Sequence, residues 1–567
     1  KSWDDWTVDQ HRRHHIGPHF IPRALRPSSP PEVAPVKSYP PHRLGMAFRW
    51  QVGSDELASA ALQLHVAPLD HHNAALLNHV APRDWLNPKP LEEYDLVAIG
   101  AGAGGLISAK QAARRGARSA LIEKHLAGGD CLNVGCVPSK ALIRSARAVK
   151  EVRNCAAFGV CVAGEVTVDF PAVMARMRRV RAEIAPADSY EGTAAAGAHM
   201  FAGKATFTGP NTLQVEESSG RVTEFRFKTA VIASGGRPIA PALYEHVPFV
   251  TNETLFNLTS LPPRMVVVGG GPIGLELAQC FAAFGCRVTV LVRGVRLLPK
   301  EDTDAAALLH AALLADGVEV LLSTAVKGAV QSGKTTATAD GGSFLEVELT
   351  CTRADGSSFV LGCECLLLAT GRAPNVLGLG LEAAGVEFNE RTGVAVNDLL
   401  RTSNPSIYAV GDVCHRFQFT HMSGEMAKAA VENALFGGSW SLASLAVPWV
   451  TYTMPEVAHV GAYEHELDAS GVEYDTYRAA LEHNDRAILD GDTEGFVKLT
   501  CAKGTDRLLG GTIVAAHAGD LIHEVTLALK EGISIESLAR VIHPYPTVGE
   551  SVMGAALGYV RTVWKKM

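Results

Sequence analysis

From residue 94 onward, the apolar residues of this chain fall into short continuous runs that alternate with longer stretches of helical spacing. The run 94–99 is typical of a strand buried in a parallel sheet, and the stretch 106–115 is typical of a helix. A second apolar run, 119–122, follows and ends at Glu123. Strand, helix and strand in this order predict a βαβ unit.

The same alternation returns further along the chain. An apolar run at 264–268, a helical stretch at 275–284 and a run at 287–292 predict a second βαβ unit. A β-rich section then extends to Leu368. The runs 230–238 and 369–412, with a helical stretch at 424–436, are predicted to belong to the first unit.

After about residue 441 the pattern changes to that of an α+β domain with its own core. The predicted strands are 449–453, 495–501 and 508–515, and the predicted helices are 520–530 and 534–541. We therefore predict an α/β fold class, with two Rossmann-like dinucleotide-binding domains and a C-terminal α+β domain. The predicted boundaries are an extension at 1–93, a first nucleotide domain at 94–238 and 369–440, a second at 239–368, and the C-terminal domain at 441–567.

The first 93 residues differ in composition from the rest. They hold 12 of the 29 prolines and 9 of the 21 histidines, and the proline pairs at 30–31 and 40–41 exclude regular helix. Residues 55–80 are predicted to form one or two short helices. The paired histidines at 14–15 and 71–72 lack thiolate partners and clear ligand spacing, so no metal site is predicted. A solvated or partner-docking extension is the preferred interpretation.

Composition narrows the class of protein. A net charge of −7 over 567 residues argues against a nucleic-acid or anionic-membrane role, and no apolar run is long enough to span a bilayer. The 11 cysteines are scattered, which predicts a reducing compartment, cytoplasmic or organellar. Because the chain begins with Lys1 rather than methionine, we expect a trimmed start, and a removed targeting peptide remains open.

Each predicted βαβ unit carries a glycine-rich turn after its first strand. In the first unit, Gly100 suits a tight turn, Gly102 a close backbone approach to a pyrophosphate, and Gly105 close packing of helix on strand. Glu123 stands 18 residues after the last of these glycines, where an acid accepts hydrogen bonds from a ribose. The first unit is therefore predicted to bind a dinucleotide.

The second turn has Gly269, Gly271 and Gly274, but no acid follows its second strand. Arg293 stands there instead, with Arg296 close by. Arginine at this place suits a 2′-phosphate, so NADP is predicted rather than NAD. The alternative is that both arginines are only solvated.

Between the two units lies a stretch, 128–140, with Cys131 and Cys136 five positions apart. They precede a predicted helix at 139–149. A helix N-terminus stabilises a thiolate and lowers the pKa of a cysteine there, which favours a redox role. The alternative is a pair of buried structural cysteines.

The motif Cys-Leu-Asn-Val-Gly-Cys-Val-Pro-Ser-Lys, with both glycine turns and the segment ending in Gly411 and Asp412, resembles the FAD-dependent class I pyridine nucleotide-disulfide oxidoreductases. Glutathione reductase, dihydrolipoamide dehydrogenase and mercuric reductase belong to this family. The likeness spans residues 94 to about 560 and is greatest to the mercuric reductase-like branch. It implies FAD on the first fingerprint and NADPH, rather than NADH, as the reductant.

The resemblance also implies roles for particular residues. Cys136 would lie beside the flavin, Cys131 would face the substrate in a redox-active disulfide, and Lys140 and Glu276 would lie near flavin and nicotinamide. Further implied cofactor-binding positions are Gly129, Gly235, Gly371, Arg372, Gly411 and Asp412, the last two at the ribitol. A homodimer is implied, in which the last domain completes the partner's site.

The chain departs from the thiol-disulfide members near its end. Their motif His-Pro-Thr-x-x-Glu aligns on Glu550, and the histidine position is then Tyr545, as in mercuric reductase. His543 stands two residues early. Paired C-terminal cysteines that deliver mercury are also missing, since the last cysteine is Cys501. Both Tyr545 and His543 are therefore candidates for the acid–base position.

The predicted function is electron transfer from NADPH through FAD and the Cys131–Cys136 disulfide to a sulfur compound or a thiophilic metal ion. One alternative is a dihydrolipoamide dehydrogenase or glutathione-type reductase. The other is an FAD-containing structural subunit that docks to a larger assembly through residues 1–93. The predicted partners are a small-molecule or metal-ion acceptor and a second copy of the chain.

Overall fold

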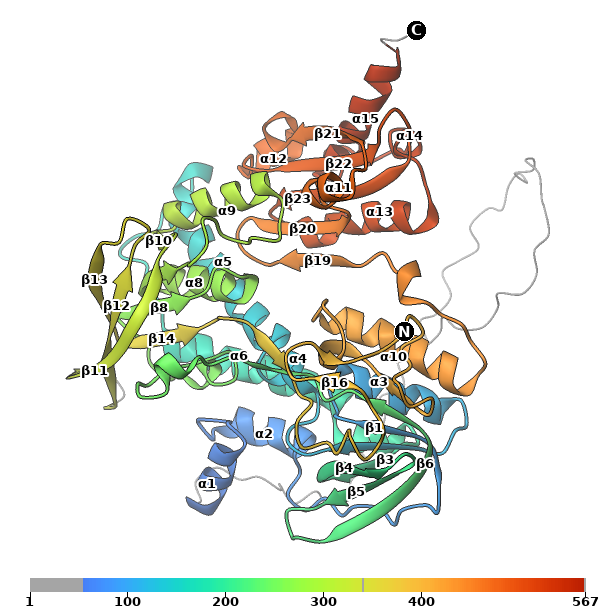
Figure 1. The fold of residues 1–567 in the computed structure, drawn as a ribbon. Helices are drawn as coiled ribbons and strands as arrows, with labels where there is room; N and C mark the ends of the chain where they lie inside the picture. The colour runs from blue at the N-terminus through green and yellow to red at the C-terminus, as the bar shows by residue number, and fades with distance from the viewer. Residues whose placement is uncertain (1–54, 339–340, 565–567) are drawn as a thin grey trace, which may run out of the picture. The chain divides into compact units, whose positions relative to one another are not determined.

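Residues 55–338 and 341–564 are described by the computed structural model of this protein (Figure 1). A seven-stranded sheet, in the order β3-β2-β1-β6-β5-β4 with β18 also paired to β6, forms its first part. Its strands are β1 (Tyr94–Ile99), β2 (Ser119–Glu123), β3 (His199–Ala202), β4 (Lys204–Gly209), β5 (Thr212–Glu216), β6 (Val222–Ile232) and β18 (Ile407–Ala409).

The long strand β6 belongs to two kinds of sheet. Its first half pairs antiparallel with β5, and its second half pairs parallel with β1 and β18. In the parallel part, Val97 lies between Ala120 and Ala230, so the first glycine turn is held at the carboxyl end of a buried central strand. The helices of this part are α3 (Ala103–Arg114), α4 (Gly129–Asn133), α5 (Cys136–Asn154), α6 (Phe170–Ile184), α7 (Tyr190–Ala195) and α10 (Thr420–Leu435).

A four-stranded parallel sheet in the order β10-β9-β8-β14 contains the second glycine turn. Its elements are β8 (Arg264–Val268), α8 (Pro272–Phe284), β9 (Arg287–Leu291), α9 (Thr303–Ala315), β10 (Glu319–Leu321) and β14 (Cys365–Leu368). The β-rich section between them is an antiparallel sheet of β11 (Ala325–Ala337), β12 (Ser343–Thr352) and β13 (Ser358–Cys363). Short strands complete this region: β7 (Gly236–Pro238), β15 (Arg372–Pro374), β16 (Phe388–Asn389) and β17 (Gly393–Val394).

The C-terminal part is a five-stranded antiparallel sheet in the order β19-β20-β23-β22-β21. Its strands are β19 (Pro448–Thr451), β20 (Glu456–Gly461), β21 (Tyr474–Ala480), β22 (Phe496–Ala502) and β23 (Leu508–Ala515), and its helices are α11 (Glu464–Ser470), α12 (Asp485–Asp490), α13 (Ala518–Glu531), α14 (Ile535–Leu538) and α15 (Glu550–Trp564). The helix predicted at 534–541 is thus only four residues long. It ends where the buried positions end, at Leu538.

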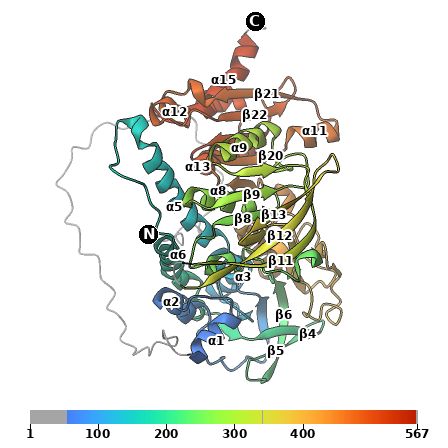
Figure 2. The same ribbon diagram turned by 90° about the vertical axis from the view of Figure 1, so that its left-hand side faces the viewer.

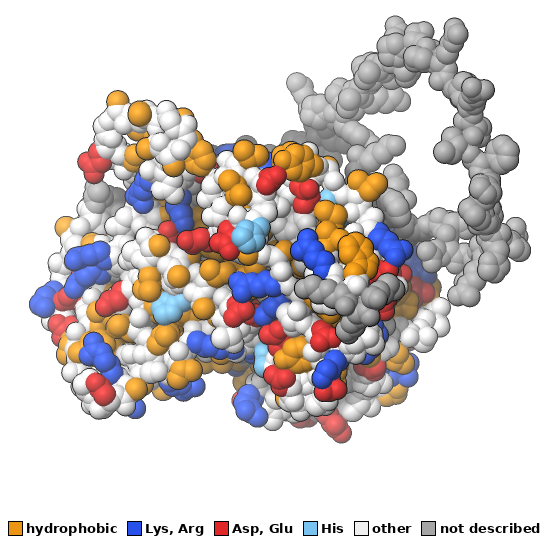
Figure 3. All heavy atoms as spheres, turned by 90° about the horizontal axis from the view of Figure 1, so that it is seen from above, with side chains coloured by type: hydrophobic (Ala, Val, Ile, Leu, Met, Phe, Trp, Pro, Cys, Tyr) orange, Lys and Arg blue, Asp and Glu red, His pale blue; other side chains and the backbone are white. Residues whose placement is uncertain are grey.

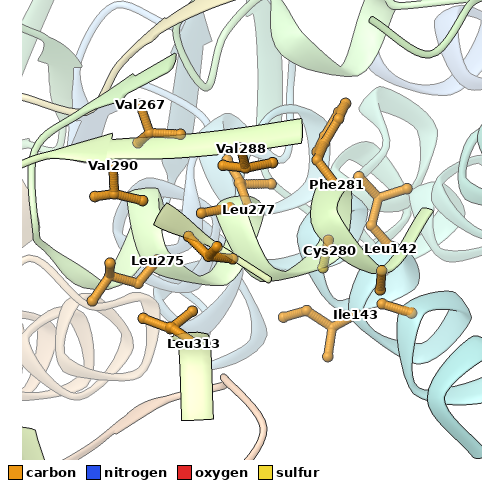
Figure 4. Close-up of a cluster of buried hydrophobic side chains, with 14 of the residues drawn as sticks. Leu142, Ile143, Val267, Leu275, Leu277, Cys280, Phe281, Val288, Val290 and Leu313 are labelled. Carbon is orange, nitrogen blue, oxygen red and sulfur yellow. The ribbon is translucent and has the colours of Figure 1, made fainter. Parts of the chain in front are cut away.

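One hydrophobic core joins the helix that follows the cysteines to the second nucleotide region. In Figure 4, Leu142 and Ile143 of α5 lie beside Cys280 and Phe281 of α8. The other face of α8 packs on β8 and β9, through residues such as Val290. Burying so much apolar surface fixes α5 on α8, and it thereby fixes the polar residues that both helices carry.

The described part of the N-terminal segment differs from the predicted solvated extension. Helices α1 (Asp55–Gln63) and α2 (His71–Val80) form as expected. Leu76, Leu77 and Val80, however, are fully buried, and α2 packs against α6 (Figure 2). The segment is therefore part of the core around the first sheet. Any docking function of residues 1–54 lies outside the described residues.

The described surface mixes charges of both signs. Figure 3 shows Lys and Arg side chains interspersed with Asp and Glu over the face above the C-terminal sheet. Among the described residues, no helix is both long and apolar enough to cross a membrane.

The packing of α2 predicts a difference between two leucines of the same segment. Leu77→Ala removes a side chain that is 0% exposed and should cost about 2–5 kcal/mol of stability. Leu86→Ala changes a side chain that is 87% exposed and should cost no more than about 0.5 kcal/mol. Thermal unfolding followed by circular dichroism compares the two variants. Equal midpoints would show that the segment is not part of the core.

Candidate functional site

The first glycine turn makes a surface that side chains would block. A Cβ on Gly105 would lie 1.8 Å from the carbonyl oxygen of Gly100, so α3 can approach β1 this closely only through glycine. Gly102 is the N-cap of α3 and makes no side-chain capping bond there. Its backbone faces that of Gly129, where a Cβ would stand 2.7 Å from the Cα of Gly102. This turn leaves the helix N-terminus open to a phosphate.

Glu123, at the end of β2, is held in one orientation by backbone donors. The N–H of Ala101 donates to Oε2 at 2.6 Å, and the N–H of His125 donates to Oε1 at 2.7 Å. Burial raises the pKa of Glu123, and these two donors act against that rise. Each carboxylate oxygen keeps a further lone pair, which a ribose hydroxyl could use. The glycine turn and Glu123 together fit the adenosine and pyrophosphate of FAD.

Arg372 joins two carboxylates that come from distant parts of the chain. Its guanidinium contacts Asp130, next to Cys131, and lies 3.4 Å from Asp412. Burial raises the pKa of Asp412, although the charge of Arg372 acts against this. Gly411 has a φ of +78°, and a Cβ there would meet Ser423 Oγ at 2.5 Å. The predicted cofactor positions Arg372, Gly411 and Asp412 are thus brought together beside α4, the helix that carries Cys131 and that we call the redox helix.

Gly235 and Gly371, the remaining predicted cofactor positions, follow β6 and β14 respectively. Gly235 has a φ of +70° and Gly371 a φ of +128°, so each backbone conformation favours glycine. The residues beside them pair in β7 and β15. The two glycines therefore lie immediately before the paired strands β7 and β15.

The two cysteines are both thiols here, Cys131 within α4 and Cys136 at the start of α5. The helix starts three residues earlier than predicted, because Pro138 in its first turn needs no hydrogen-bond partner for its nitrogen. Cys136 Sγ lies 3.4 Å from the hydroxyl oxygen of Thr420.

The two thiols share one proton unequally. A hydrogen bond from Cys131, helped by Thr420 and the charge of Lys140, outweighs burial and lowers the pKa of Cys136 to about 6. The same hydrogen bond, with burial, raises the pKa of Cys131. At neutral pH, Cys136 is therefore the thiolate and Cys131 the thiol.

Lys140 and Glu276 form a largely buried ion pair across two helices. Lys140 Nζ lies 2.9 Å from Glu276 Oε2, and the Glu276 side chain is 7% exposed. The other carboxylate oxygen accepts the backbone N–H of Tyr452 at 2.9 Å, and the Tyr452 ring lies 4.3 Å from Nζ. Burial alone would lower the pKa of Lys140, but the Glu276 carboxylate outweighs it and raises the pKa.

The second glycine turn is also open at its helix N-terminus. Gly271 is the N-cap of α8 without a side-chain cap, and a Cβ there would meet nothing within 4 Å. Gly269 has a φ of +126°, and a Cβ would lie 2.2 Å from Ala369 O. A Cβ on Gly274 would lie 2.9 Å from Gly269 O. This arrangement fits the pyrophosphate of a nicotinamide dinucleotide.

The two arginines predicted for a 2′-phosphate differ in their surroundings. Arg293 is exposed just after β9. Arg296 instead donates to the carbonyl oxygens of Leu298, Pro299 and Glu301, at 3.2, 2.6 and 2.9 Å. Three of the five guanidinium donors of Arg296 are thus used by its own loop. The phosphate role of both arginines stays a prediction.

The C-terminal motif turns its two candidate residues in opposite directions. Tyr545 is 72% exposed and donates to Asp485 Oδ2 at 2.8 Å. His543 has a side chain 8% exposed, with Nε2 3.1 Å from the Glu524 carboxylate and Nδ1 3.1 Å from Val541 O.

Glu550 accepts the N–H of Thr547 at 3.0 Å. These hydrogen bonds of Tyr545, His543 and Glu550 are all with residues of the C-terminal region. The chain thus brings together its other predicted catalytic residues but does not bring this motif to the cysteines.

The comparisons with known proteins agree with this geometry. The profile of the family described as pyridine nucleotide-disulphide oxidoreductase matches residues 94–433, and that of its dimerisation domain matches residues 447–556. The chain belongs to the pyridine nucleotide-disulphide oxidoreductase family. As in its other members, FAD and NAD(P)H are the expected cofactors, and the dimerisation domain supports a homodimer.

Relatives of this oxidoreductase carry two different names. It is 35% identical over 475 residues to a mercuric reductase of Streptomyces lividans, which covers 83% of this chain and 97% of that one. It is also 35% identical over 476 residues to a mitochondrial dihydrolipoyl dehydrogenase of Caenorhabditis elegans, covering 82% and 92%. Among solved structures, the HOCl-induced flavoprotein disulfide reductase RclA of Escherichia coli matches with a TM-score of 0.71 at 26% identity, covering 82% and 99%.

Sequence reasoning missed two contacts of the redox centre. Thr420 is separated from Cys136 by 284 positions, and no local motif marks it. Tyr452 contributes a backbone N–H, which every residue except proline has. Asp130, by contrast, lies inside the cysteine stretch, and its charge beside Cys131 was a visible signal.

The hydrogen bonds to Cys136 predict how its reactivity depends on pH. Because its pKa is lowered to about 6, alkylation should be fast above pH 6 and decline as the pH falls through that value. Thr420→Val removes a donor worth roughly 0.5–1.5 kcal/mol and should raise the midpoint by about half to one unit. Cys131→Ala should raise it further. Iodoacetamide labelling of reduced protein, read by peptide mass spectrometry, measures the midpoints, and an unchanged order would contradict the assignment.

Proposed function

We propose that this oxidoreductase passes electrons from NADPH to the Cys131–Cys136 pair and from there to a thiophilic metal ion, with oxidised sulfur compounds as poorer acceptors. FAD, when bound, supplies the two-electron carrier between nicotinamide and sulfur. The observation that supports the proposal best is the placement of Cys136 at the start of α5, with Sγ 3.4 Å from the Thr420 hydroxyl and the Lys140–Glu276 pair on the next turn. The cysteine pair argues against the alternative of a purely structural subunit.

The chain's own residues have distinct tasks in this proposal. Opening a Cys131–Cys136 disulfide takes two electrons and one proton, and it leaves Cys131 as thiol and Cys136 as thiolate. The hydrogen bond between them and the Thr420 hydroxyl stabilise that thiolate. Lys140, held in place by Glu276, adds a positive charge that also favours the Cys136 thiolate. Cys131, left as the thiol, must release its proton when it binds or attacks an acceptor.

Arg293 supports a preference for NADPH. It is exposed just after the last residue of β9, at the carboxyl end of the strand where nucleotides bind in such sheets. No acid occupies the ribose position there. Arg296 supports the same preference indirectly, because it holds the loop that follows Arg293.

Exchanging Arg293 should therefore change nucleotide choice. Arg293→Glu should lower kcat/KM for NADPH roughly 10- to 150-fold, since one charge-assisted hydrogen bond is lost and a repulsion is gained. NADH should be affected much less. Arg287→Glu is the matched control, because Arg287 is an exposed arginine at the other end of β9. Steady-state kinetics with both nucleotides decides, and a wild type that uses NADH equally well would refute the preference.

The C-terminal motif supports a metal ion as the better acceptor. Reducing a disulfide needs a group that gives and takes a proton near pH 7, and histidine suits this task. Tyr545 occupies the aligned position, and its hydrogen bond to Asp485 raises its pKa above the usual 10. His543 is turned toward Glu524 and away from solvent. A metal ion needs thiolate ligands more than a proton relay.

We therefore expect Hg(II) to be reduced faster than glutathione disulfide or lipoamide, by about 100-fold if acid–base catalysis by histidine is missing. NADPH oxidation at matched acceptor concentrations measures the ratio. Tyr545→Phe should slow Hg(II) reduction, while His543→Ala should leave it nearly unchanged in protein that remains folded. Rapid disulfide turnover that survives Tyr545→Phe but is lost in His543→Ala would make this a thiol-type reductase with a displaced histidine.

A further inference from the structure

Helix α2 lies outside the part of the chain that the family profile matches, which begins at residue 94. One face of it is nevertheless buried, and this face includes a polar side chain, Asn73. Asn73 is 0% exposed, although asparagine is usually found on the surface. A buried amide has to be hydrogen-bonded, so its partners show what the helix is built to contact.

The main partner of Asn73 is a buried arginine of α6. Arg181 Nη2 donates to Asn73 Oδ1 at 2.6 Å, and Arg181 Nη1 donates to the carbonyl oxygen of Asn133 at 2.6 Å. Arg181 is 2% exposed, and burial lowers its pKa to about 10. Its Nε has no protein partner. Asn73 and Asn133 thus provide the two acceptors that hold this guanidinium in place.

Asn133 is the last residue of α4, the five-residue helix that contains Cys131. Its side-chain amide donates back to the carbonyl oxygens of Ala127 and Gly129, both at 2.9 Å. The N–H of Ala127 in turn donates to Val80 O, at the end of α2, at 2.9 Å. The segment just before α4 is therefore bonded to α2 directly, and the last residue of α4 is bonded to it through Arg181.

A second contact fixes α2 on α6. Asp70, the N-cap of α2, accepts the N–H of Asn73 at 2.9 Å and lies 2.6 Å from Arg178 Nε. The Asn73 amide also donates to Pro68 O at 2.7 Å. Because the carboxylate and the amide are both engaged, Asn73 has little freedom to follow Arg181 if α6 shifts.

We propose that α2 is a positioning element for the redox helix: Asn73 holds Arg181 against the last carbonyl group of α4 and so fixes Cys131 opposite Cys136. A five-residue helix is too short to be stable by itself, so it needs such external contacts. The inference rests on the proposed role of Cys131 as the reactive thiol. It makes Asn73 a positioning residue that acts through Arg181.

Asn73→Ala tests the contact in the FAD-loaded protein reduced with dithiothreitol, which makes the result independent of nucleotide and acceptor. Without its acceptor, Arg181 should release Asn133. Amide hydrogen exchange in a peptide covering 129–135 should become about tenfold faster, and so should iodoacetamide labelling of Cys131, because a lost bond to a charged group raises local opening by this order.

Asn87→Ala is the matched control from the same segment. Asn87 also exchanges two hydrogen bonds, with the N–H and carbonyl of Ala202 at the sheet edge, at 2.7 and 2.9 Å. It should leave both rates within about twofold of the wild type. Equal effects of the two substitutions, or none from Asn73→Ala, would overturn the proposal.

Two further variants keep the test decisive if Asn73→Ala does not fold. Asn73→Asp keeps an acceptor for Arg181 and loses only the donor to Pro68 O, so the rates should stay at the wild-type level. Arg181→Lys keeps the charge but has one nitrogen for two acceptors, so both rates should rise. The reverse order, fast in Asn73→Asp and unchanged in Arg181→Lys, would refute a role for this contact.

Discussion

The redox centre depends on a partly buried ion pair between helices that are far apart in sequence. Lys140 follows the cysteines on α5, and Glu276 lies on α8, one turn after the second glycine turn. Removing Lys140 would leave the Glu276 carboxylate, which is 7% exposed, without a compensating charge, and this is strongly destabilising. Lys140 is 35% exposed and would stay partly hydrated without Glu276. Because Glu276 also accepts the backbone N–H of Tyr452, the pair joins all three parts of the fold at one point. The apolar packing of α5 on α8 brings the two side chains to this position.

That arrangement also decides which sulfur carries charge. Two thiolates side by side in a partly buried site would repel, so only one thiol ionises readily. Thr420 and Lys140 both favour charge on Cys136, and Cys131 keeps the proton. Cys131 is thus uncharged before an acceptor binds, and Cys136 is a stabilised anion. To react with an acceptor, Cys131 must therefore give up that proton, since the thiolate and not the thiol is the nucleophile and the metal ligand.

The parts of this molecule that local sequence patterns encode could be predicted. The two βαβ units follow from apolar periodicity, and the glycines follow from a backbone that allows no Cβ, as at Gly105. Contacts made by tertiary packing were out of reach, such as Thr420 on Cys136. The bonds of Arg296 to backbone carbonyls were also out of reach, because they depend on a loop conformation. Helix α2 was predicted, but its burial was missed, because the proline- and histidine-rich composition around it favoured a solvated extension.

Within one chain, the C-terminal motif is the part of the predicted site that does not lie at the cysteines. Tyr545 is exposed beside Asp485, and Ile542 next to His543 is 95% exposed. An apolar side chain that is so exposed beside a predicted catalytic residue is typical of a surface that another protein covers. The dimerisation-domain match covers this motif and supports a second copy as that protein. In such a dimer, an outward-pointing side chain is needed to reach the partner's Cys131, and Tyr545 and His543 are the candidates. His543 is held inward by Glu524, so this geometry favours Tyr545.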